Sequence, residues 1–226
     1  MKRLLDIFVS GILLLLLLIP GMFVLILLRF TGEGKVFYLQ PRVGLGGKRF
    51  KVYKLATMVA NSLNIGNKDI TVRNDPRVLP VGRFLRKTKL NELPQLFNVF
   101  KGDMSLVGWR PLVEKSFSYY PQHVQQQIIE AKPGLTGIGS IFFRDEEELV
   151  EKSNKEPLEL YTEDIAPHKG ELELWYNKHR SFWLDLKVLF CTAWVVLFSQ
   201  SKMYETLFPD LPSPPADGEI MRLRGL

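Results

Sequence analysis

An almost uninterrupted apolar stretch opens the chain and limits what the rest of it can be. Between Arg3 and Arg29 the residues are LLDIFVSGILLLLLLIPGMFVLILL, in which Asp6 is the only charged residue. The stretch is long enough to span a bilayer, which takes about 20 residues of helix. A cleavable signal peptide is the competing interpretation, but no small-residue cleavage site follows the apolar run. The sequence therefore predicts a membrane helix over residues 1–30.

The residues alone do not decide whether this helix crosses the membrane or turns back within it. Pro20 lies near its middle, where a proline removes a backbone hydrogen bond and bends a helix. Basic residues flank both ends, with Lys2 and Arg3 before the stretch and Arg29 and Lys35 after it. Two basic flanks indicate two cytoplasmic ends, which a straight span does not provide. A kinked transmembrane helix and a re-entrant hairpin are therefore both compatible with the residues.

The length and net charge of the chain say less about its fold and its partners. A chain of 226 residues forms one domain with appendages, and its net charge of +6 favours anionic partners. That charge alone allows nucleic acid, anionic lipid or a phosphorylated substrate. The single Cys191 excludes an intrachain disulfide, and the three histidines show no metal-ligand spacing.

The segment from Arg83 to Pro111 combines a lone carboxylate with many basic residues. Its first part contains Arg83, Arg86, Lys87 and Lys89, and Arg110 closes it. With Asn91 as N-cap, Glu92 would occupy the first position of a helix running to Phe100. A positive helix end beside arginines suits a phosphate ester. In the alternative, Glu92 only complements the helix dipole and the basic residues form a solvated face.

Short extended segments lie between the apolar stretch and this segment. Residues 36–38 and 50–53 have strand character, and residues 44–47 form a turn that lacks the glycine spacing of a P-loop. Five basic residues in this part can meet anionic lipid headgroups: Arg42, Lys48, Arg49, Lys51 and Lys54. Residues 59–82 form a polar connection with a turn that Asp75 and Arg77 are expected to fix, and a catalytic role of this pair is the alternative.

Three further features follow Pro111. Residues 112–129 are expected to be helical, and the glycines of residues 132–139 allow the backbone to approach a ligand closely. The acidic residues 145–148 begin a solvated helix, unless Asp145 or Glu146 supplies charge to a site. Residues 172–198 form an interfacial helix with Trp175, Tyr176, Trp183 and Trp194 at headgroup level. The proline-rich residues 206–226 are expected to form a flexible tail.

Several motifs match one known family. They are Arg83-Phe84-Leu85-Arg86-Lys87-Thr88, Leu93-Pro94-Gln95-Leu96-Phe97-Asn98-Val99, Lys101-Gly102-Asp103-Met104-Ser105-Leu106-Val107-Gly108 with Arg110-Pro111, and Ser181-Phe182-Trp183-Leu184-Asp185-Leu186-Lys187. The chain thereby resembles the small monotopic polyprenyl-phosphate phosphoglycosyltransferases, the bacterial initiating sugar transferases. The resemblance extends to about residue 198.

This resemblance implies a fold and a location. The expected fold is α+β and mostly helical, with a re-entrant membrane helix over residues 1–30. A cytoplasmic domain over residues 31–205 would carry a short β-hairpin and amphipathic interfacial helices. The implied location is the cytoplasmic face of the bacterial inner membrane.

The resemblance also implies an activity. Members transfer a phospho-sugar from a UDP-sugar to undecaprenyl phosphate, with Mg²⁺ as cofactor and no nucleic acid involved. Carried over to this chain, Glu92 and Asn91 occupy the catalytic positions, and Glu92 is the metal ligand. Arg86, Arg110, Lys54 and Arg83 would bind substrate phosphate. Membrane lipid is a further expected partner, and a homodimer is left open.

Asn91 departs from the family pattern, which usually has Asp before the Glu. The usual Asp is the covalent nucleophile, whereas an amide is neutral and a poor nucleophile. Ala56 and Trp109 depart as well, where a basic residue and a proline are usual. The alternative to an enzyme is therefore a non-catalytic membrane partner or regulator of an active transferase.

Overall fold

The computed structural model describes residues 1–31, 33–62, 75–198 and 201–224, and these form a mostly helical α+β fold. The longer helices are α1 (Lys2–Leu16), α2 (Leu18–Phe30), α3 (Pro80–Lys87), α4 (Gln95–Lys101), α6 (Gln122–Ile128), α8 (Glu146–Lys152), α10 (Ala166–His179) and α11 (Phe182–Leu197). The shorter ones are α5 (Glu114–Phe117), α7 (Ile138–Phe142), α9 (Pro157–Leu160), α12 (Met203–Leu207) and α13 (Glu219–Arg224). Single turns are η1 (Leu45–Gly47), η3 (Leu90–Glu92) and η4 (Tyr161–Ile165).

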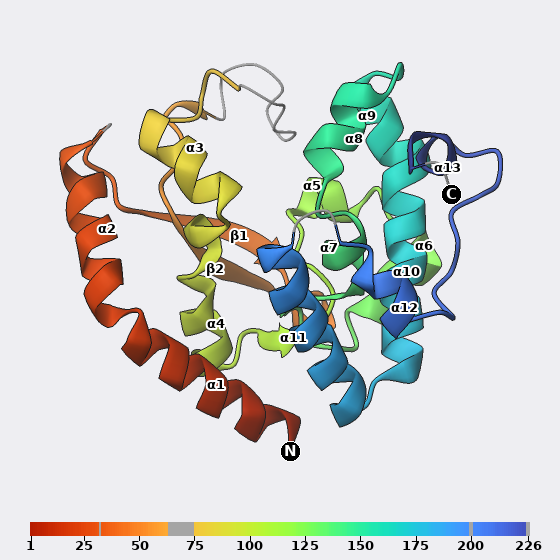
Figure 1. The fold of residues 1–226 in the computed structure, drawn as a ribbon, viewed down its shortest axis with the longest axis horizontal. Coiled ribbons are helices and arrows are strands. Elements are labelled where there is room, and N and C mark those ends of the chain that lie inside the picture. The colour runs from red at the N-terminus through yellow and green to blue at the C-terminus, as the bar shows by residue number, and fades with distance from the viewer. Residues whose placement is uncertain (32, 63–74, 199–200, 225–226) are drawn as a thin grey trace.

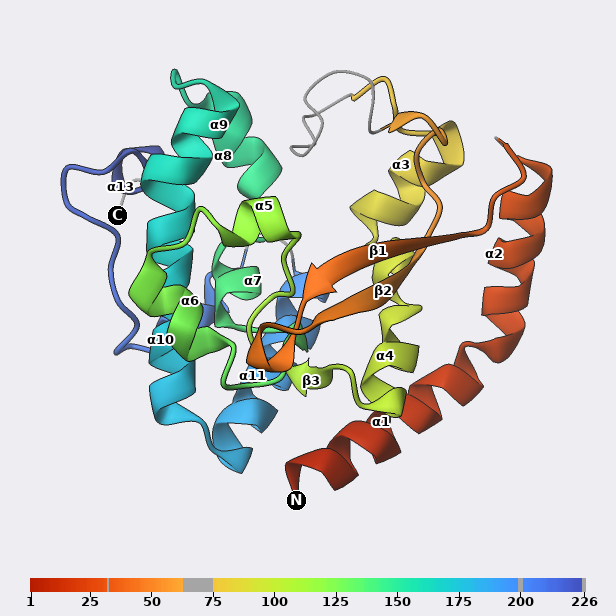
Figure 2. The same ribbon diagram turned by 180° about the vertical axis from the view of Figure 1, so that it is seen from behind.

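The predicted hairpin is confirmed and is longer than expected. Strand β1 (Phe37–Val43) pairs antiparallel with β2 (Arg49–Leu55), and η1 makes the turn between them. Figure 2 shows the hairpin crossing the middle of the molecule, between the α1–α2 flank and the flank that carries α10. The hairpin thus joins the two flanks.

A second, parallel pair of strands explains the glycines of residues 132–139. Strand β3 (Ser105–Val107) pairs with β4 (Gly134–Thr136). A Cβ at Gly134 would lie 2.1 Å from the Gly108 nitrogen, and one at Gly137 would lie 2.1 Å from the Gly108 oxygen. These glycines therefore admit the protein's own backbone, and the close approach of a ligand stays a prediction.

Helices α1 and α2 form a bent arm along one flank (Figure 1). No single helix in the described ranges is long and apolar enough to cross a membrane, but this pair together has the length and composition, with a bend of 61°. The break falls at Leu17, one turn before Pro20. The proline has no N–H to donate to the Leu16 carbonyl, which explains a bend in that turn.

The start of α1 is fixed to the globular part by polar side chains. The Lys2 ammonium donates to Asp185 at 2.7 Å, and Arg3 donates to the backbone oxygen of Val99 at 2.6 Å. The Asp6 carboxylate, 4 % exposed, accepts from the Ser105 hydroxyl at 3.0 Å and the Leu106 N–H at 2.9 Å. The one charged residue inside the apolar stretch is therefore a buried anchor.

The core lies between the hairpin, the β3–β4 pair and helices α6, α7, α10 and α11. Tyr176 on α10 is only 1 % exposed and donates to Asp185 at 2.6 Å, so its expected place at headgroup level is wrong. Trp183, at 73 % exposed, does face outward. Phe208 and Ile220 are buried in the same core, so the described part of the C-terminal tail packs on the domain and is not a free extension.

The structure confirms the predicted turn at Asp75 and Arg77 but divides the helix predicted over residues 112–129. The Arg77 guanidinium donates to the Asp75 carboxylate at 2.6 Å, which confirms the pair expected to fix that turn. Residues 63–74 of the polar connection lie outside the described residues. Residues 112–129 form two short helices, α5 and α6, because Pro121 interrupts the chain before α6.

Candidate active site

Glu92 is the centre of a half-buried ion-pair cluster. Its Oε1 accepts from the Arg110 guanidinium at 2.6 Å and from the Lys54 ammonium at 3.3 Å, and its Oε2 accepts from Arg110 at 3.2 Å. The Glu92 side chain is 16 % exposed and that of Lys54 is 17 % exposed. Three predicted site residues, from η3, β2 and the chain after β3, therefore meet at one place.

Glu92 and its neighbouring cations stabilise one another's ionised forms. Burial by itself would raise the pKa of Glu92, but Arg110 and Lys54 outweigh it and hold that pKa well below its usual range. Burial, together with the neighbouring Arg42 and Arg110, lowers the pKa of Lys54 to about 8. At neutral pH Glu92 is therefore ionised, and its cations provide a positive surround that suits a phosphate oxygen.

The local backbone at Glu92 differs from the predicted helix. Residues 90–92 form the 3-10 turn η3, and α4 begins only at Gln95 with Pro94 as its N-cap. Pro94 cannot donate to the preceding turn, so the chain enters α4 through short-range bonds such as Glu92 N–H to the Lys89 carbonyl at 3.1 Å. The expectation of Glu92 at the first helical position is wrong, and its positive surround comes from side chains.

The residue that leads into this turn has an unusual backbone conformation. Lys89 has φ of 59°, the left-handed region, and is the only non-glycine residue with positive φ in the described part of the chain. Such a conformation costs an ordinary side chain about 1 kcal/mol or more, and it persists where the surrounding structure fixes it. Here it turns the chain sharply so that Asn91 and Glu92 point into the protein.

Asn91 is buried directly beside Glu92. It is 7 % exposed, and within the described ranges its side-chain oxygen Oδ1 has no hydrogen-bond partner. A buried carbonyl oxygen without a partner is costly and calls for an explanation. This enclosed oxygen keeps unused hydrogen-bonding and ligating capacity beside the ion-paired carboxylate.

The predicted phosphate residues on α3 lie at a different place. The Arg86 guanidinium is 3.8 Å from the Glu147 carboxylate of α8, and Arg83 is exposed. Neither forms a direct contact with Glu92 that the structure records. The structure therefore brings Lys54, Asn91, Glu92 and Arg110 together, and Arg86 belongs to a neighbouring charge cluster.

Two functional candidates were not predicted as site residues. Arg42, expected at the lipid surface, donates to the Pro111 carbonyl at 3.1 Å, and burial together with Arg110 lowers its pKa to about 10. Glu173 on α10 is 1 % exposed, and a Cβ at Gly139 would lie 2.5 Å from its Oε1. No local pattern marks Glu173, because α10 contributes it from far along the chain.

Glu173 is a second buried carboxyl group behind the cluster. Burial raises its pKa to about 8, although the nearby backbone N–H of Arg110 and the charge of Lys169 favour the ionised form. No hydrogen bond of normal geometry reaches either carboxyl oxygen from the described part of the chain. Glu173 is therefore neutral at pH 7 and adds no negative charge beside Arg110.

A half-buried carboxylate held by two cations describes a site suited to an anion. The model of the bacterial sugar transferase family matches residues 1–199, so the chain belongs to that family.

Three relatives illustrate the family. The undecaprenyl-phosphate galactose phosphotransferase of Salmonella typhimurium is 37 % identical over 211 residues, which cover 87 % of this chain and 40 % of that protein. The UDP-glucose:undecaprenyl-phosphate glucose-1-phosphate transferase of Klebsiella pneumoniae is 35 % identical, covering 88 % of this chain and 41 % of that one. The uncharacterized sugar transferase EpsL of Bacillus subtilis is 36 % identical, with 88 % and 89 % covered. This chain thus spans less than half of the first two relatives and most of the third.

Proposed function

We propose that this chain is a phosphoglycosyltransferase that moves a sugar-1-phosphate from a UDP-sugar to undecaprenyl phosphate. In this reaction the bond from oxygen to phosphorus within the diphosphate breaks, UMP leaves, and the sugar-bearing phosphorus bonds to an oxygen of the lipid phosphate. The observation that carries the proposal is the half-buried Glu92 paired with Lys54 and Arg110 in a chain of this family. The names of two similar proteins give the same reaction class.

The side chains have distinct roles in this proposal. Arg110 presents a planar guanidinium, which suits bidentate contact with phosphate oxygens, and Lys54 adds a compact positive charge. Glu92 is ionised and keeps both cations in place between turnovers. Because its pKa is far below neutral, Glu92 is suited to binding and electrostatic work and is a poor general base.

Mg²⁺ is the cofactor that fits this donor set. Mg²⁺ prefers oxygen ligands and commonly takes one or two carboxylates together with substrate phosphates. Glu92 supplies a carboxylate, and the unpaired Oδ1 of Asn91 supplies a second oxygen on the adjacent residue. No cluster of three or more acidic, histidine or cysteine ligands exists in the described ranges, so substrate phosphates would complete the coordination. When bound, the ion would neutralise negative charge on the diphosphate.

The arm is proposed to enter and leave the membrane on one side. Lys2, Arg3 and Asp6 bond the start of α1 to the domain, and at the other end of the arm Glu33 accepts from the Ala60 N–H at 2.7 Å. A chain fixed to one domain at both ends is better suited to a re-entrant hairpin than to a span. Its outward apolar side chains include Phe8, Leu15, Ile19, Phe23 and Phe30.

The exposed aromatic residues of other elements support the same placement. Phe84 on α3, Phe100 on α4 and Trp183 on α11 are 62 %, 43 % and 73 % exposed. Such side chains are stabilised by lipid contact and not by water. The domain would thereby sit on the cytoplasmic face of the bacterial inner membrane, where a lipid phosphate and a soluble nucleotide sugar can both reach the site.

The test is UMP release by the purified protein. With undecaprenyl phosphate and a panel of UDP-sugars, we expect Mg²⁺-dependent release of UMP with at least one sugar. Glu92→Gln should lower kcat/KM by about 100-fold or more, because it removes the charge that organises Lys54 and Arg110. Glu114→Gln is the matched control, since that carboxylate is 69 % exposed in a surface ion pair. Full activity of Glu92→Gln would contradict the assignment.

A second candidate is a non-catalytic membrane partner of an active transferase. It is favoured by Asn91, whose buried neutral amide stands where a nucleophilic carboxylate is usual in the family. The test is Asn91→Asp. A gain from no turnover to clear turnover would support the non-catalytic partner, whereas UMP release by the unaltered chain would exclude it.

A further inference from the structure

Three consecutive acidic residues at the start of α8 each pair with a basic residue from a different helix. The pairs are Asp145 with Arg224 of α13 at 2.5 Å, Glu146 with Lys169 of α10 at 2.6 Å, and Glu147 with Arg86 of α3 at 3.8 Å. This acidic turn therefore connects the C-terminal tail, the core helix and the helix that carries a predicted phosphate-binding arginine.

Arg224 is the tail residue of these ion pairs, and its side chain is largely buried. Its side chain is 9 % exposed, and its guanidinium also donates to the Phe142 carbonyl at 2.6 Å. The guanidinium carbon lies 4.6 Å from the Phe142 ring centre and 5.9 Å from that of Phe143. Ion pairing, a carbonyl bond and stacking on two rings fix one planar group, so the contact is well defined in geometry.

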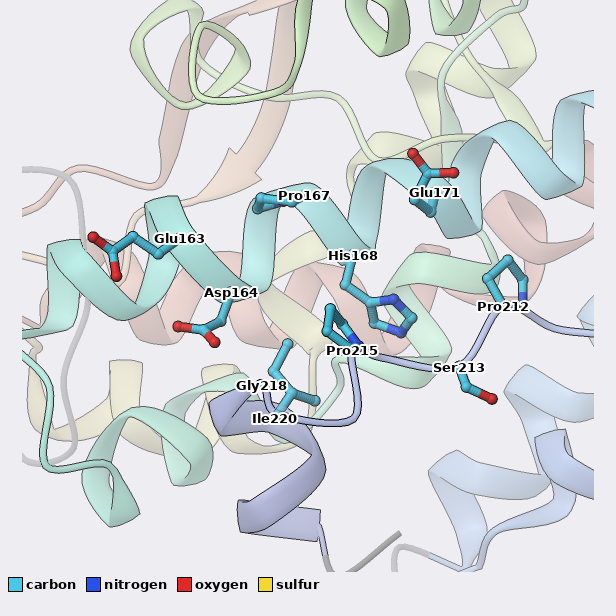
Figure 3. A pocket seen from close by; sticks show the side chains of 10 residues that line it. All are labelled: Glu163, Asp164, Pro167, His168, Glu171, Pro212, Ser213, Pro215, Gly218 and Ile220. Carbon is cyan, nitrogen blue, oxygen red and sulfur yellow. The ribbon is translucent and has the colours of Figure 1, made fainter.

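The rest of the tail holds α13 in position for this contact. Ile220 is 1 % exposed, the Glu219 N–H donates to Asp164 at 3.0 Å, and the Glu219 carboxylate accepts from the Ser153 hydroxyl at 3.0 Å. Figure 3 shows Pro215 and Ile220 of the tail facing His168 across a pocket beside α10. These tail residues lie beyond the part of the chain that the family model matches.

We propose that Arg224 is a positioning residue for the active site, acting through the acidic turn to place Arg86 at the edge of the site. This inference rests on the proposed function and adds to it that Arg86, from the charge cluster next to Glu92, binds a phosphate of the nucleotide sugar. The two clusters are neighbours, because the charges of Arg86 and Glu147 act on Lys89 together with those of Glu92 and Arg110. Asp145 and Glu147 lie in one turn, so a shift of Asp145 moves the carboxylate that faces Arg86. Loss of the Arg224 contact would therefore misplace Arg86 without touching Glu92, Lys54 or Arg110.

The experiment is a double-mutant cycle on UMP release. Arg224→Ala and Glu147→Gln should each raise KM for the UDP-sugar roughly three- to tenfold and leave kcat nearly unchanged, because Arg86 would act in substrate binding. The double variant should be no worse than the larger single effect, since both act through one path. Arg222→Ala is the matched control, because Arg222 is 57 % exposed and its ion pair, with Glu219, lies within α13. Wild-type KM in Arg224→Ala, or strictly additive effects, would overturn the proposal.

Amide hydrogen exchange separates this inference from the proposed function. Arg224→Ala should accelerate exchange in residues 80–87 of α3 as well as in residues 146–152 of α8, while Arg222→Ala should leave both unchanged. Unaltered exchange in α3 would overturn the positioning role whether or not the protein turns over. Absence of UMP release by the wild-type chain with every UDP-sugar would instead refute the proposed function.

Discussion

At the scale of single residues, the site is defined by how few negative charges surround Arg110. Glu92 is ionised and bonded to Arg110, whereas Glu173 lies behind the same arginine with its pKa raised to about 8 by burial. In the described part of the chain Glu92 is the carboxylate bonded to Lys54 and Arg110, whereas Glu146 acts on Arg110 only through its charge. The positive charge of the two cations is thereby only partly balanced, which suits a substrate phosphate. The neutral state of Glu173 is part of the electrostatics of the site.

Glu173 also predicts how stability depends on pH. Its folded-state pKa is above the ordinary value of 4.5, so the folded protein keeps a proton that the unfolded chain releases. The contribution of this group to stability therefore falls as pH rises from about 4.5 to about 8 and then levels off. Glu173→Gln should remove this fall and be more stable than wild type at pH 8, by an amount on the order of a few kcal/mol.

The measurement is urea or thermal unfolding of both proteins in the same detergent at pH 5 and pH 8. Glu171→Gln is the control on the same helix, because the Glu171 carboxylate is 51 % exposed. Equal pH dependence in wild type and Glu173→Gln would show that Glu173 ionises normally in the folded state.

At the scale of elements, α1 is held to the domain by polar bonds as well as by apolar packing. Asp6 accepts bonds from Ser105 and Leu106 of β3, and Lys2 reaches Asp185 of α11. Arg110 follows the end of β3 by three residues, so α1 is bonded to the strand that leads into the site. The arm is thereby connected to the residues that would bind phosphate.

Asp6→Ala tests this anchor. The change leaves the Ser105 hydroxyl and the Leu106 N–H without an acceptor in a buried place, so we expect a loss of about 2–3 kcal/mol in the free energy of unfolding. Leu4→Ala is the matched control on the same helix, since Leu4 is 71 % exposed and should change stability in detergent very little. Chemical unfolding followed by circular dichroism gives both values. A loss no greater than that of the control would mean that the bonds to β3 do not hold α1.

At the scale of the whole molecule, the arm and the domain form one unit with both ends of the arm attached (Figure 1). A spanning helix would have to separate the start of α1 from the domain and break the bonds of Lys2, Arg3 and Asp6. Placing those charged groups across a membrane from their partners costs several kcal/mol. We therefore expect Met1 on the same side as the active site.

Cysteine labelling tests this topology. A cysteine inserted between Met1 and Lys2, in a Cys191→Ser background, should resist a membrane-impermeant thiol reagent in intact cells and react after lysis. The Cys191→Ser chain without the insertion controls for background, since Cys191 is buried and is the only cysteine. Labelling in intact cells would establish a spanning helix and leave the assignment of Glu92 unaffected.

The sequence by itself determined the features that depend on neighbouring residues. Apolar length, a central proline and turn residues predict the bent arm, the β1–β2 hairpin and the Asp75–Arg77 turn, because these follow from local backbone preferences. The family motifs also placed Asn91, Glu92 and Arg110 among the site residues. The exact start of α4 was beyond such reasoning, since it depends on how the chain turns at Lys89.

Only the tertiary structure decided which charges meet. Glu92 bonds to Arg110, 18 residues away, and to Lys54, 38 residues away, while Arg86, much nearer in sequence, faces Glu147. The backbone of Gly108 packs closely against the glycines after Pro133. The C-terminal tail folds back onto the domain, so that Ile220 is buried. Local sequence patterns do not predict such contacts, because burial and ion pairing depend on which surfaces, distant in sequence, pack together.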